Sequence, residues 1–214
     1  TLSNRFNAVG TQLTQQNETI NSQLGTLAGQ VNKLTSNIAE YNKQIVAATA
    51  TGNTPNSLLD ARSEAVRQLN ELVGVTVQER DGNYDVYLGS GQSLVTGVKG
   101  NTLSVQPGVA DKSQASLRIN YESFSSDVTS VVTGGAIGGL VRKKVKKALG
   151  LDQCRFAAGG AAPMPMELLQ WYSRLGLHIN EGYGMTENLA VSHITLPGKN
   201  QQGSVGPTCE GVDH

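Results

Sequence analysis

Apolar residues recur at alternating steps of three and four along the first 45 residues of the chain, and only Gln16 breaks the pattern. This spacing places them on one face of a single long helix, and it is typical of a coiled-coil seam that a partner helix covers. The seam consists of Phe6, Val9, Leu13, Ile20, Leu24, Leu27, Val31, Leu34, Ile38, Tyr41 and Ile45. Gln, Asn and Thr fill most other positions, and Gly10, Gly25 and Gly29 each lower intrinsic helicity by about 1 kcal/mol relative to Ala. Packing must therefore hold this helix in place.

Residues 51–55, Thr-Gly-Asn-Thr-Pro, predict the end of the first helix and the start of a second. Glycine commonly ends a helix, and proline suits the first turn of the next one. The second helix has its own apolar face, formed by Leu58, Leu59, Val66, Leu69, Leu72 and Val73. Because a short connection places consecutive helices side by side, we expect an antiparallel helical hairpin.

After Gly74 the apolar period changes to two, which predicts short strands. Val75 and Val77 lead into Asp81-Gly82-Asn83, and Tyr84, Val86 and Leu88 then return on one face, as in a β-hairpin with a glycine-containing turn. Further strands are predicted at residues 93–95, 102–105 and 115–120. The expected fold of this part is a long α-helical hairpin plus a small antiparallel β region.

Residue types change abruptly along the chain. Both cysteines (Cys154 and Cys209), all three histidines, all three methionines and the single tryptophan lie after residue 150. We interpret this step as a chimera of two parts, residues 1–140 and 141–214. Two lone cysteines specify neither a disulfide framework nor a metal site, so we expect free thiols of a reducing compartment.

Charge and hydropathy exclude some partners of the whole chain. The formal net charge is zero, which gives no reason to expect nucleic acid as a partner. No stretch approaches the roughly 18 consecutive apolar residues needed for a membrane span. The first part also lacks His and Cys, and its acidic residues are scattered. Asp60 and Arg62 are better explained as a solvated or structural ion pair than as a functional one, so an assembly role is favoured over catalysis.

Several motifs of the first part resemble the flagellar hook-associated protein 1 family, and the resemblance rests on their order. They are residues 2–6, 42–45, 58–62, 72–75, 91–95 and 133–140. Members of this family form the junction between hook and filament of the bacterial flagellum. The resemblance implies a structural role outside the cell, with hook-associated proteins or further copies of the chain as partners. It also implies that the family's two terminal helices lie outside residues 1–140.

The second part begins with the basic cluster at residues 142–147. Such a cluster can bind nucleic acid or phospholipid, but it is more simply a solvated helix face with Val141, Val145, Ala148 and Leu149 turned inward. Next come a strand and small-residue loop at 156–163, a helix from Met166 to about Leu175, a strand at 177–181 and a loop at 182–187. This order predicts a partial α/β segment with small-residue loops at strand ends, where such sheets bind ligands.

The stretch Tyr-Gly-Met-Thr-Glu at 183–187 is the sharpest chemical motif. Tyr183 offers a ring for stacking on a base, Thr186 a hydroxyl for a phosphate oxygen, and Glu187 a carboxylate suited to Mg²⁺. The alternative is an ordinary turn with a capping threonine. His178 and His193 have no carboxylate or nucleophile at a suggestive spacing, which favours surface or packing roles.

Together with Gly-Gly-Ala-Ala-Pro at 159–163 and Gly-Ser-Val-Gly-Pro at 203–207, this stretch resembles the AMP-forming long-chain acyl-CoA synthetases. The resemblance implies that Gly160 and Ala161 line the adenine and acyl pocket, Tyr183 stacks on adenine, Thr186 contacts the α-phosphate and Glu187 holds Mg²⁺. It also implies a cytoplasmic parent.

The glycine-rich phosphate loop ending in Lys is not found in the sequence, and the family's ribose-binding Asp and catalytic Lys would lie beyond His214. Three hypotheses remain: a structural module with a passive tail, an acyl-adenylating enzyme, and a fusion without a complete activity. We favour the third, with ATP and Mg²⁺ needed only if the remnant of the synthetase functions.

Overall fold

The computed structural model describes residues 2–89, 91–108, 115–185, 192–195 and 201–211, without the side chains of residues 2–6, 9 and 13. The chain forms two compact units, Thr1–Lys144 (unit 1) and Val145–His214 (unit 2). Within the described residues, no helix combines the length and the apolar character needed to cross a membrane.

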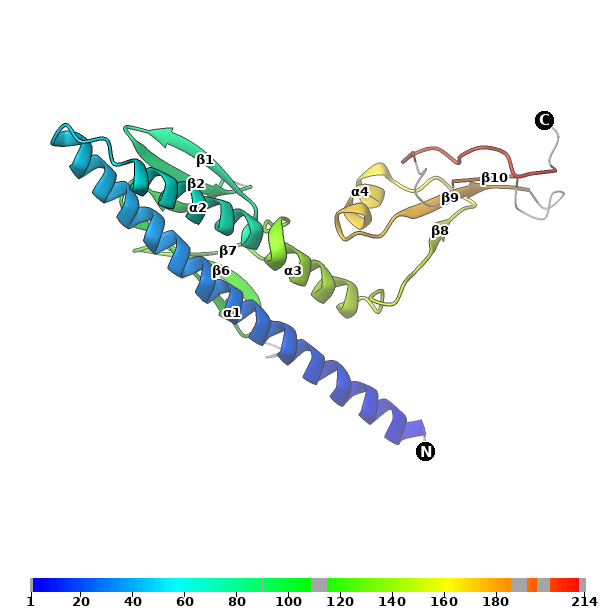
Figure 1. Cartoon of the computed structure of the whole chain (residues 1–214). Coiled ribbons are helices and arrows are strands. Elements are labelled where there is room, and N and C mark those ends of the chain that lie inside the picture. Colours follow the sequence, from blue (N-terminus) through cyan, green and yellow to red (C-terminus); the bar gives the residue numbers. More distant parts are fainter. Residues whose placement is uncertain (1, 90, 109–114, 186–191, 196–200, 212–214) are drawn as a thin grey trace. The chain divides into compact units, whose positions relative to one another are not determined.

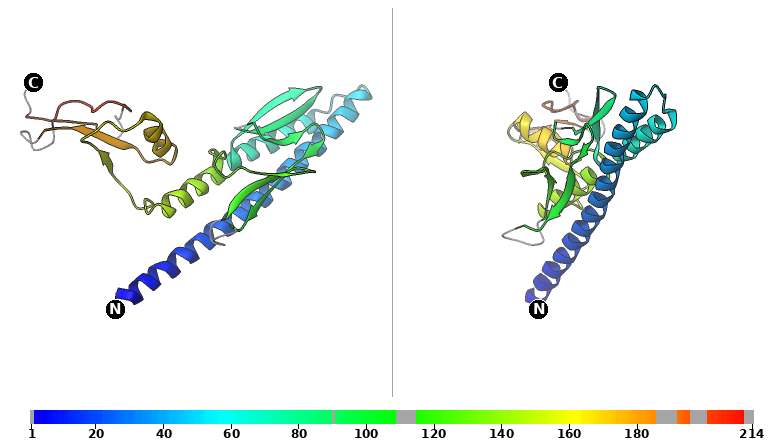
Figure 2. Two further views of the ribbon diagram at one scale, coloured as in Figure 1. Left: turned by 180° about the vertical axis from the view of Figure 1, so that it is seen from behind. Right: turned by 90° about the vertical axis from the view of Figure 1, so that its left-hand side faces the viewer.

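Two helices form the frame of unit 1. Helix α1 spans Leu2–Ala50, and α2 spans Asn56–Val73 after a turn that contains Gly52 at φ 81°. In Figures 1 and 2, α2 lies alongside the later turns of α1, while the first turns of α1 extend beyond α2 and the strands. The predicted helical hairpin is thus confirmed, with both boundaries close to the expected residues.

Two antiparallel sheets lie along this hairpin. The first contains β1 (Val75–Arg80), β2 (Asn83–Leu88), β3 (Ser93–Thr96) and β4 (Lys99–Gly100), in that order. The second contains β5 (Thr102–Gln106), β6 (Ser116–Asn120) and β7 (Ser125–Asp127). The sequence predicted all of these strands except the short β4 and β7. In the β1–β2 hairpin Arg80 pairs with Asn83, and Asp81 and Gly82 both have positive φ, as the tight two-residue turn requires.

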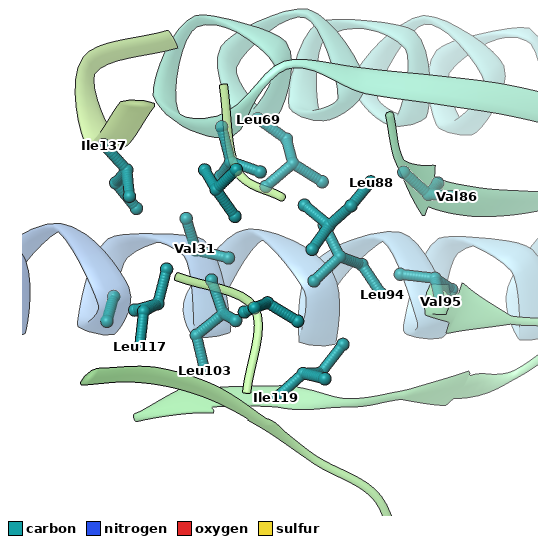
Figure 3. Close-up of a cluster of buried hydrophobic side chains, with 14 of the residues drawn as sticks. Val31, Leu69, Val86, Leu88, Leu94, Val95, Leu103, Leu117, Ile119 and Ile137 are labelled. Carbon is teal, nitrogen blue, oxygen red and sulfur yellow. The ribbon is translucent and has the colours of Figure 1, made fainter. Parts of the chain in front are cut away.

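One hydrophobic core joins the helices and the sheets of unit 1. Val31 of α1, Leu69 of α2 and the inward residues of the strands converge in Figure 3. The largest fully buried apolar side chains are Ile38, Leu69, Leu88, Leu94, Leu117, Ile119 and Ile137. From Ile20 onward, most of the α1 seam faces this core, so α2 and the strands cover it together. Because the side chains of Phe6, Val9 and Leu13 lie outside the described residues, the structure leaves the start of the seam as a prediction.

Two asparagines of α1 form the same kind of paired hydrogen bonds with strand residues. The Asn32 amide donates to the Leu103 carbonyl at 2.9 Å, and its oxygen accepts from the Leu103 N–H at 2.6 Å. Asn42 makes the same two-way pair with Tyr84, at 3.0 Å in both directions. A side-chain amide carries a donor and an acceptor, as a peptide group does, so each asparagine satisfies one strand residue in place of a neighbouring strand.

Residues 72–75 contact residues 133–140 through the backbones of Gly74 and Gly134. A Cβ added to Gly74 would lie 2.9 Å from the Cα of Gly134, closer than real Cβ atoms approach. Glycine therefore allows the end of α2 to touch the segment that begins helix α3 (Gly135–Ala148). Two stretches on which the family resemblance rests are thus brought together by backbone contact.

Helix α3 corrects the interpretation of the basic cluster. Lys144 is buried in unit 1, where its ammonium donates to the Ala115 carbonyl at 2.5 Å and to Asn21 Oδ1 at 3.2 Å. Ala148 and Leu149, expected to turn inward, are exposed instead. The prediction was wrong at these three positions. At Lys144 helical spacing alone did not reveal that α1 and Ala115 supply oxygens for an ammonium.

Unit 2 contains a small sheet of order β10-β9-β8. Strand β8 (Ala157–Gly159), helix α4 (Met166–Arg174) and strand β9 (Ile179–Tyr183) form a β-α-β segment, because β8 and β9 are parallel. Strand β10 (His193–Ile194) pairs antiparallel with β9. The partial α/β segment is confirmed, but β9 lies two residues later than predicted. Leu168, assigned to the inner face of α4, is exposed.

Candidate functional site

Arg62 is a deeply buried charged residue of unit 1, with 2% of its surface exposed. Its Nη1 donates to Asn42 Oδ1 at 3.0 Å and to the Gly82 carbonyl at 2.7 Å. The guanidinium carbon lies 3.6 Å from the centre of the Tyr84 ring, a cation–π contact. The expected ion pair of Arg62 with Asp60 was wrong: the described partners of Arg62 are neutral groups, and Asp60 is exposed.

The Arg62 centre, formed by Arg62, Asn42, Gly82 and Tyr84, connects elements of unit 1. Asn42 links it to β2 and to the β3–β4 turn, because its amide donates to the Tyr84 carbonyl and also to Gly97 O at 2.6 Å. A nearby carboxylate oxygen, Asp85 Oδ1, accepts from the Gly97 N–H at 2.6 Å. These contacts hold α1, α2 and the first sheet together, and each described polar atom of Asn42 is used in them.

A hollow of about 300 Å³ in unit 2 collects the described residues of the predicted nucleotide site. Gly160 and Ala161 line it from the loop after β8, and Tyr183 lines it from the end of β9. Half of the Tyr183 surface is exposed, so its ring is open to a ligand. Thr186 and Glu187 lie outside the described residues, and their predicted contacts with phosphate and Mg²⁺ stay predictions.

The backbone of the loop after β8 explains the small residues there. A Cβ at Gly160 would lie 3.2 Å from the Gly182 carbonyl, which is tighter than most Cβ contacts. Ala161 has φ 69°, a left-handed conformation that non-glycine residues rarely adopt. Such a residue persists only where its surroundings over-determine it, and such residues cluster at binding sites.

The sequence interpretation missed Glu181, a carboxylate that lines the same hollow. Only 8% of its surface is exposed. Oε2 accepts from the Gly203 N–H at 3.1 Å and Oε1 from the Met164 N–H at 3.4 Å. Glu181 therefore ties the two glycine-containing loops to β9. The alternation of a strand that ends at Tyr183 places Glu181 and Tyr183 on one face, and this was the signal that could have found it.

Unit 2 also holds two histidines and two cysteines among its described residues. His178 is exposed, while His193 lies in β10 with its ring centre 6.2 Å from that of Tyr183. His193 Nδ1 is 3.2 Å from Ser192 Oγ. Cys154 and Cys209 are free thiols. Across the part of the chain that the structure describes, no group of three His, Cys, Asp or Glu residues is placed to hold a metal ion.

Parts of the chain are similar to fatty-acid–CoA ligases. The chain is 45% identical over 58 residues to the long-chain-fatty-acid–CoA ligase ACSBG2 of Xenopus laevis, covering 27% of this chain and 8% of that protein. It is 36% identical over 73 residues to the putative fatty-acid–CoA ligase fadD11 of Mycobacterium tuberculosis, covering 34% of this chain and 13% of that protein. These matches support the resemblance of the second part, and they are short.

Longer similarities connect the chain to flagellar proteins. It is 29% identical over 188 residues to flagellar hook-associated protein 1 of Escherichia coli, covering 86% of this chain. The chain spans 34% of the length of that relative. The solved hook junction protein FlgK of Burkholderia pseudomallei matches 63% of this chain and 25% of its own chain, with a TM-score of 0.57 and 36% identity.

The family model for the helical domain of flagellar hook-associated protein FlgK matches residues 1–153. This range includes all of unit 1 and continues past Leu140, where the sequence suggested a join, to the end of α3 and five residues beyond. The chain therefore belongs to the flagellar hook-associated protein FlgK family, which it matches through its helical domain.

Proposed function

We propose that the chain is a structural module of the junction between flagellar hook and filament, where it contacts hook-associated proteins or further copies of itself outside the cell. The observation that carries this proposal is the family match over residues 1–153, which includes the whole core of unit 1. The buried Arg62 centre supports it too, because the hydrogen bonds of Arg62 to Asn42 and Gly82 join α2 to α1 and to the β1–β2 turn.

The first turns of α1 supply a surface suited to assembly. Ala8, Thr11 and Thr14 are exposed there. The hydroxyls of Thr11, Thr14 and Thr19 each donate to the carbonyl four residues earlier, at 2.9–3.1 Å. These bonds satisfy the hydroxyls within the helix and leave the threonine methyl groups for contact. The exposed surface is thus less polar than its composition indicates.

Co-sedimentation of the full chain with isolated flagellar hooks tests the proposal. We expect saturable binding that Val9→Asp weakens, since the sequence places Val9 on the seam and a charge there opposes packing. Gln12→Asp, at an exposed position of the same helix, is the matched control and should bind as the parent chain does. A chain that stays in the supernatant at saturating hook concentrations contradicts the proposal.

For unit 2 we propose a ligase remnant that keeps a weak nucleotide-binding hollow without a complete adenylation activity. Support comes from the convergence of Gly160, Ala161 and Tyr183 around one hollow and from the strained backbone of Ala161. By resemblance, Thr186 and Glu187 would contact the α-phosphate and Mg²⁺ of bound ATP. No flagellar role of unit 1 depends on this binding.

Calorimetric titration of the full chain with ATP and Mg²⁺ tests this second proposal. We expect weak heats that Tyr183→Ala removes, while Phe156→Ala, an exposed aromatic change outside the hollow, leaves them intact. No binding in the parent chain contradicts a nucleotide hollow. Pyrophosphate release from ATP and a fatty acid, abolished by Glu187→Ala, would instead show a working enzyme.

A further inference from the structure

A second hollow, of about 340 Å³, lies in unit 1 between the β3–β4 hairpin and the turn that joins β6 to β7. The turn contains residues 121–124 and is closed by a hydrogen bond from the Tyr121 N–H to the Phe124 carbonyl at 2.8 Å. Lys99, Gly100 and Asn101 line the facing side. None of these residues belongs to the Arg62 centre or to the α1 seam.

Two aromatic rings, those of Tyr121 and Phe124, line this hollow and form an aromatic platform. The Tyr121 and Phe124 rings are stacked, with centres 4.5 Å apart and planes at 24°. Phe124 is 62% exposed, the largest value among the exposed large apolar residues described in the chain. Tyr121 is partly buried and packs against the core of unit 1, whereas the exposed Phe124 ring is a feature that the packing of the core does not explain.

Paired polar groups stand beside the platform. Lys99 Nζ lies 2.8 Å from Glu122 Oε1, and both side chains are mostly exposed. An ammonium has three donors and a carboxylate about four acceptor positions, so one ion pair leaves capacity on both groups. Asn101 Nδ2 donates to the Ser93 carbonyl and lies 3.3 Å from Ser93 Oγ, which fixes a further hydroxyl in the hollow.

We propose that this hollow binds the pyranose ring of a saccharide. The C–H face of a pyranose is apolar and flat enough to rest on the exposed face of Phe124. Adjacent ring hydroxyls both donate and accept, so one can donate to Glu122 while its neighbour accepts from Lys99. The ion pair leaves no net charge in the hollow, which favours a neutral ligand over a phosphate or a carboxylate.

A contact with another protein fits these residues less well. The centre of such a contact is usually dry, and covering the Lys99–Glu122 pair would desolvate two charges that now lie in water. A sugar keeps them hydrogen-bonded. Because the hollow is shallow and the charges are exposed, binding should be weak, in the millimolar range.

Amide chemical shifts of the isotope-labelled full chain, titrated with methyl glucoside, methyl galactoside and N-acetylglucosamine, test the inference. We expect saturable shifts confined to residues 93–101 and 121–124 with at least one of these sugars. Glycerol, a polyol without a ring, should give none that saturate. Absence of saturable shifts with all three sugars at concentrations well above millimolar overturns the inference.

Variants separate the ring contact from a change in fold. Phe124→Ala should weaken binding about tenfold, because it removes the aromatic platform while changing an exposed side chain. Phe156→Ala, which removes a similarly exposed ring from unit 2, should leave binding and Tm unchanged. Glu122→Gln should reduce affinity several-fold. Self-association of the chain that Phe124→Ala abolishes, with no effect of sugars, would show a protein contact and overturn the proposal.

Discussion

Units 1 and 2 differ in how completely they cover their apolar side chains. Among the described residues, every member of the single core cluster lies in unit 1, between Ile20 and Val141. Among the residues of unit 2 that the structure describes, only Leu169, Leu175 and Leu177 are buried apolar residues. Its exposed large apolar residues are Leu149, Phe156, Met166, Leu168, Trp171, Tyr183, Met185 and Val205, against Val46, Val98 and Phe124 in unit 1.

This difference in apolar burial indicates which part of the chain is stable by itself. Hydrophobic burial contributes roughly 25 cal/mol for each Å² removed from water, and the helices and both sheets of unit 1 share one buried layer. The three short strands of unit 2 receive only α4 as a cover in the described residues. We therefore expect unit 1 to have the larger free energy of unfolding and unit 2 the smaller one.

The largest effect is expected from Asn42→Leu in unit 1. Asn42 is fully buried and bonds Arg62, Tyr84 and Gly97. Leucine would remove one hydrogen-bond acceptor of the buried guanidinium and the side-chain partners of the Tyr84 and Gly97 peptide groups. We expect a loss of about 3–5 kcal/mol in the free energy of unfolding, measured by urea titration of the helical circular dichroism. Lys43→Leu, at the exposed neighbouring position, should change it little. A small loss in Asn42→Leu would show that the asparagine pairs are dispensable.

A matched pair of leucines compares the two cores directly. Leu69 has none of its surface exposed and Leu169 has 3%. Leu69→Ala should lower the free energy of unfolding of unit 1 by about 2–5 kcal/mol, because a close-packed site cannot collapse around the cavity. Leu169→Ala should cost unit 2 less, since its surroundings are thinly packed. Equal losses in the free energy of unfolding, with each unit measured by its own spectroscopic signal, would contradict this difference between the cores.

Trp171 offers a separate signal for unit 2, because it is the only tryptophan. It lies in α4 and is 40% exposed, whereas the helical circular dichroism comes mainly from the 49 residues of α1 and the 18 of α2. In a urea titration we expect the Trp171 fluorescence to change at a lower concentration than the helical signal. Coincident transitions would indicate one cooperative unit and contradict the distinction between the two.

The two units also differ in which of their structural features could be predicted from the sequence. The α1–α2 hairpin and the β1–β2 turn were predictable, because apolar spacing and turn glycines act over a few residues. The asparagine pairs were not predictable, since Asn32 meets Leu103 from 71 positions away. In unit 2, motifs identified Gly160, Ala161 and Tyr183, whose place around one hollow follows from the β8–α4–β9 order. Glu181 was missed because its contacts come from loops on both sides of it in the sequence.

The smallest effect concerns an exposed network on α2, where unit 1 relies on charge and not on burial. Hydrogen bonds from Arg67 and then Gln68, with the positive charge of Arg67, lower the pKa of Glu64 from 4.5 to about 2. Because the folded pKa lies below the unfolded one, this stabilisation is present above pH 4.5 and is lost as the pH falls through about 2. Arg67 Nη2 lies 2.7 Å from Glu64 Oε1, but both side chains are at least half exposed, so salt screens the pair and its effect on stability is slight.

Arg67→Gln should return the pKa of Glu64 toward 4.5, as measured by carboxyl chemical shifts during an acid titration. Arg80→Gln, at an exposed position in β1, removes an equal charge away from this network and should leave the Glu64 titration unchanged. If Glu64 instead titrates near 4.5 in the parent chain, the network is open in solution. Unit 1 would then owe its greater stability to its core and to the Arg62 centre alone, which sharpens the contrast with unit 2.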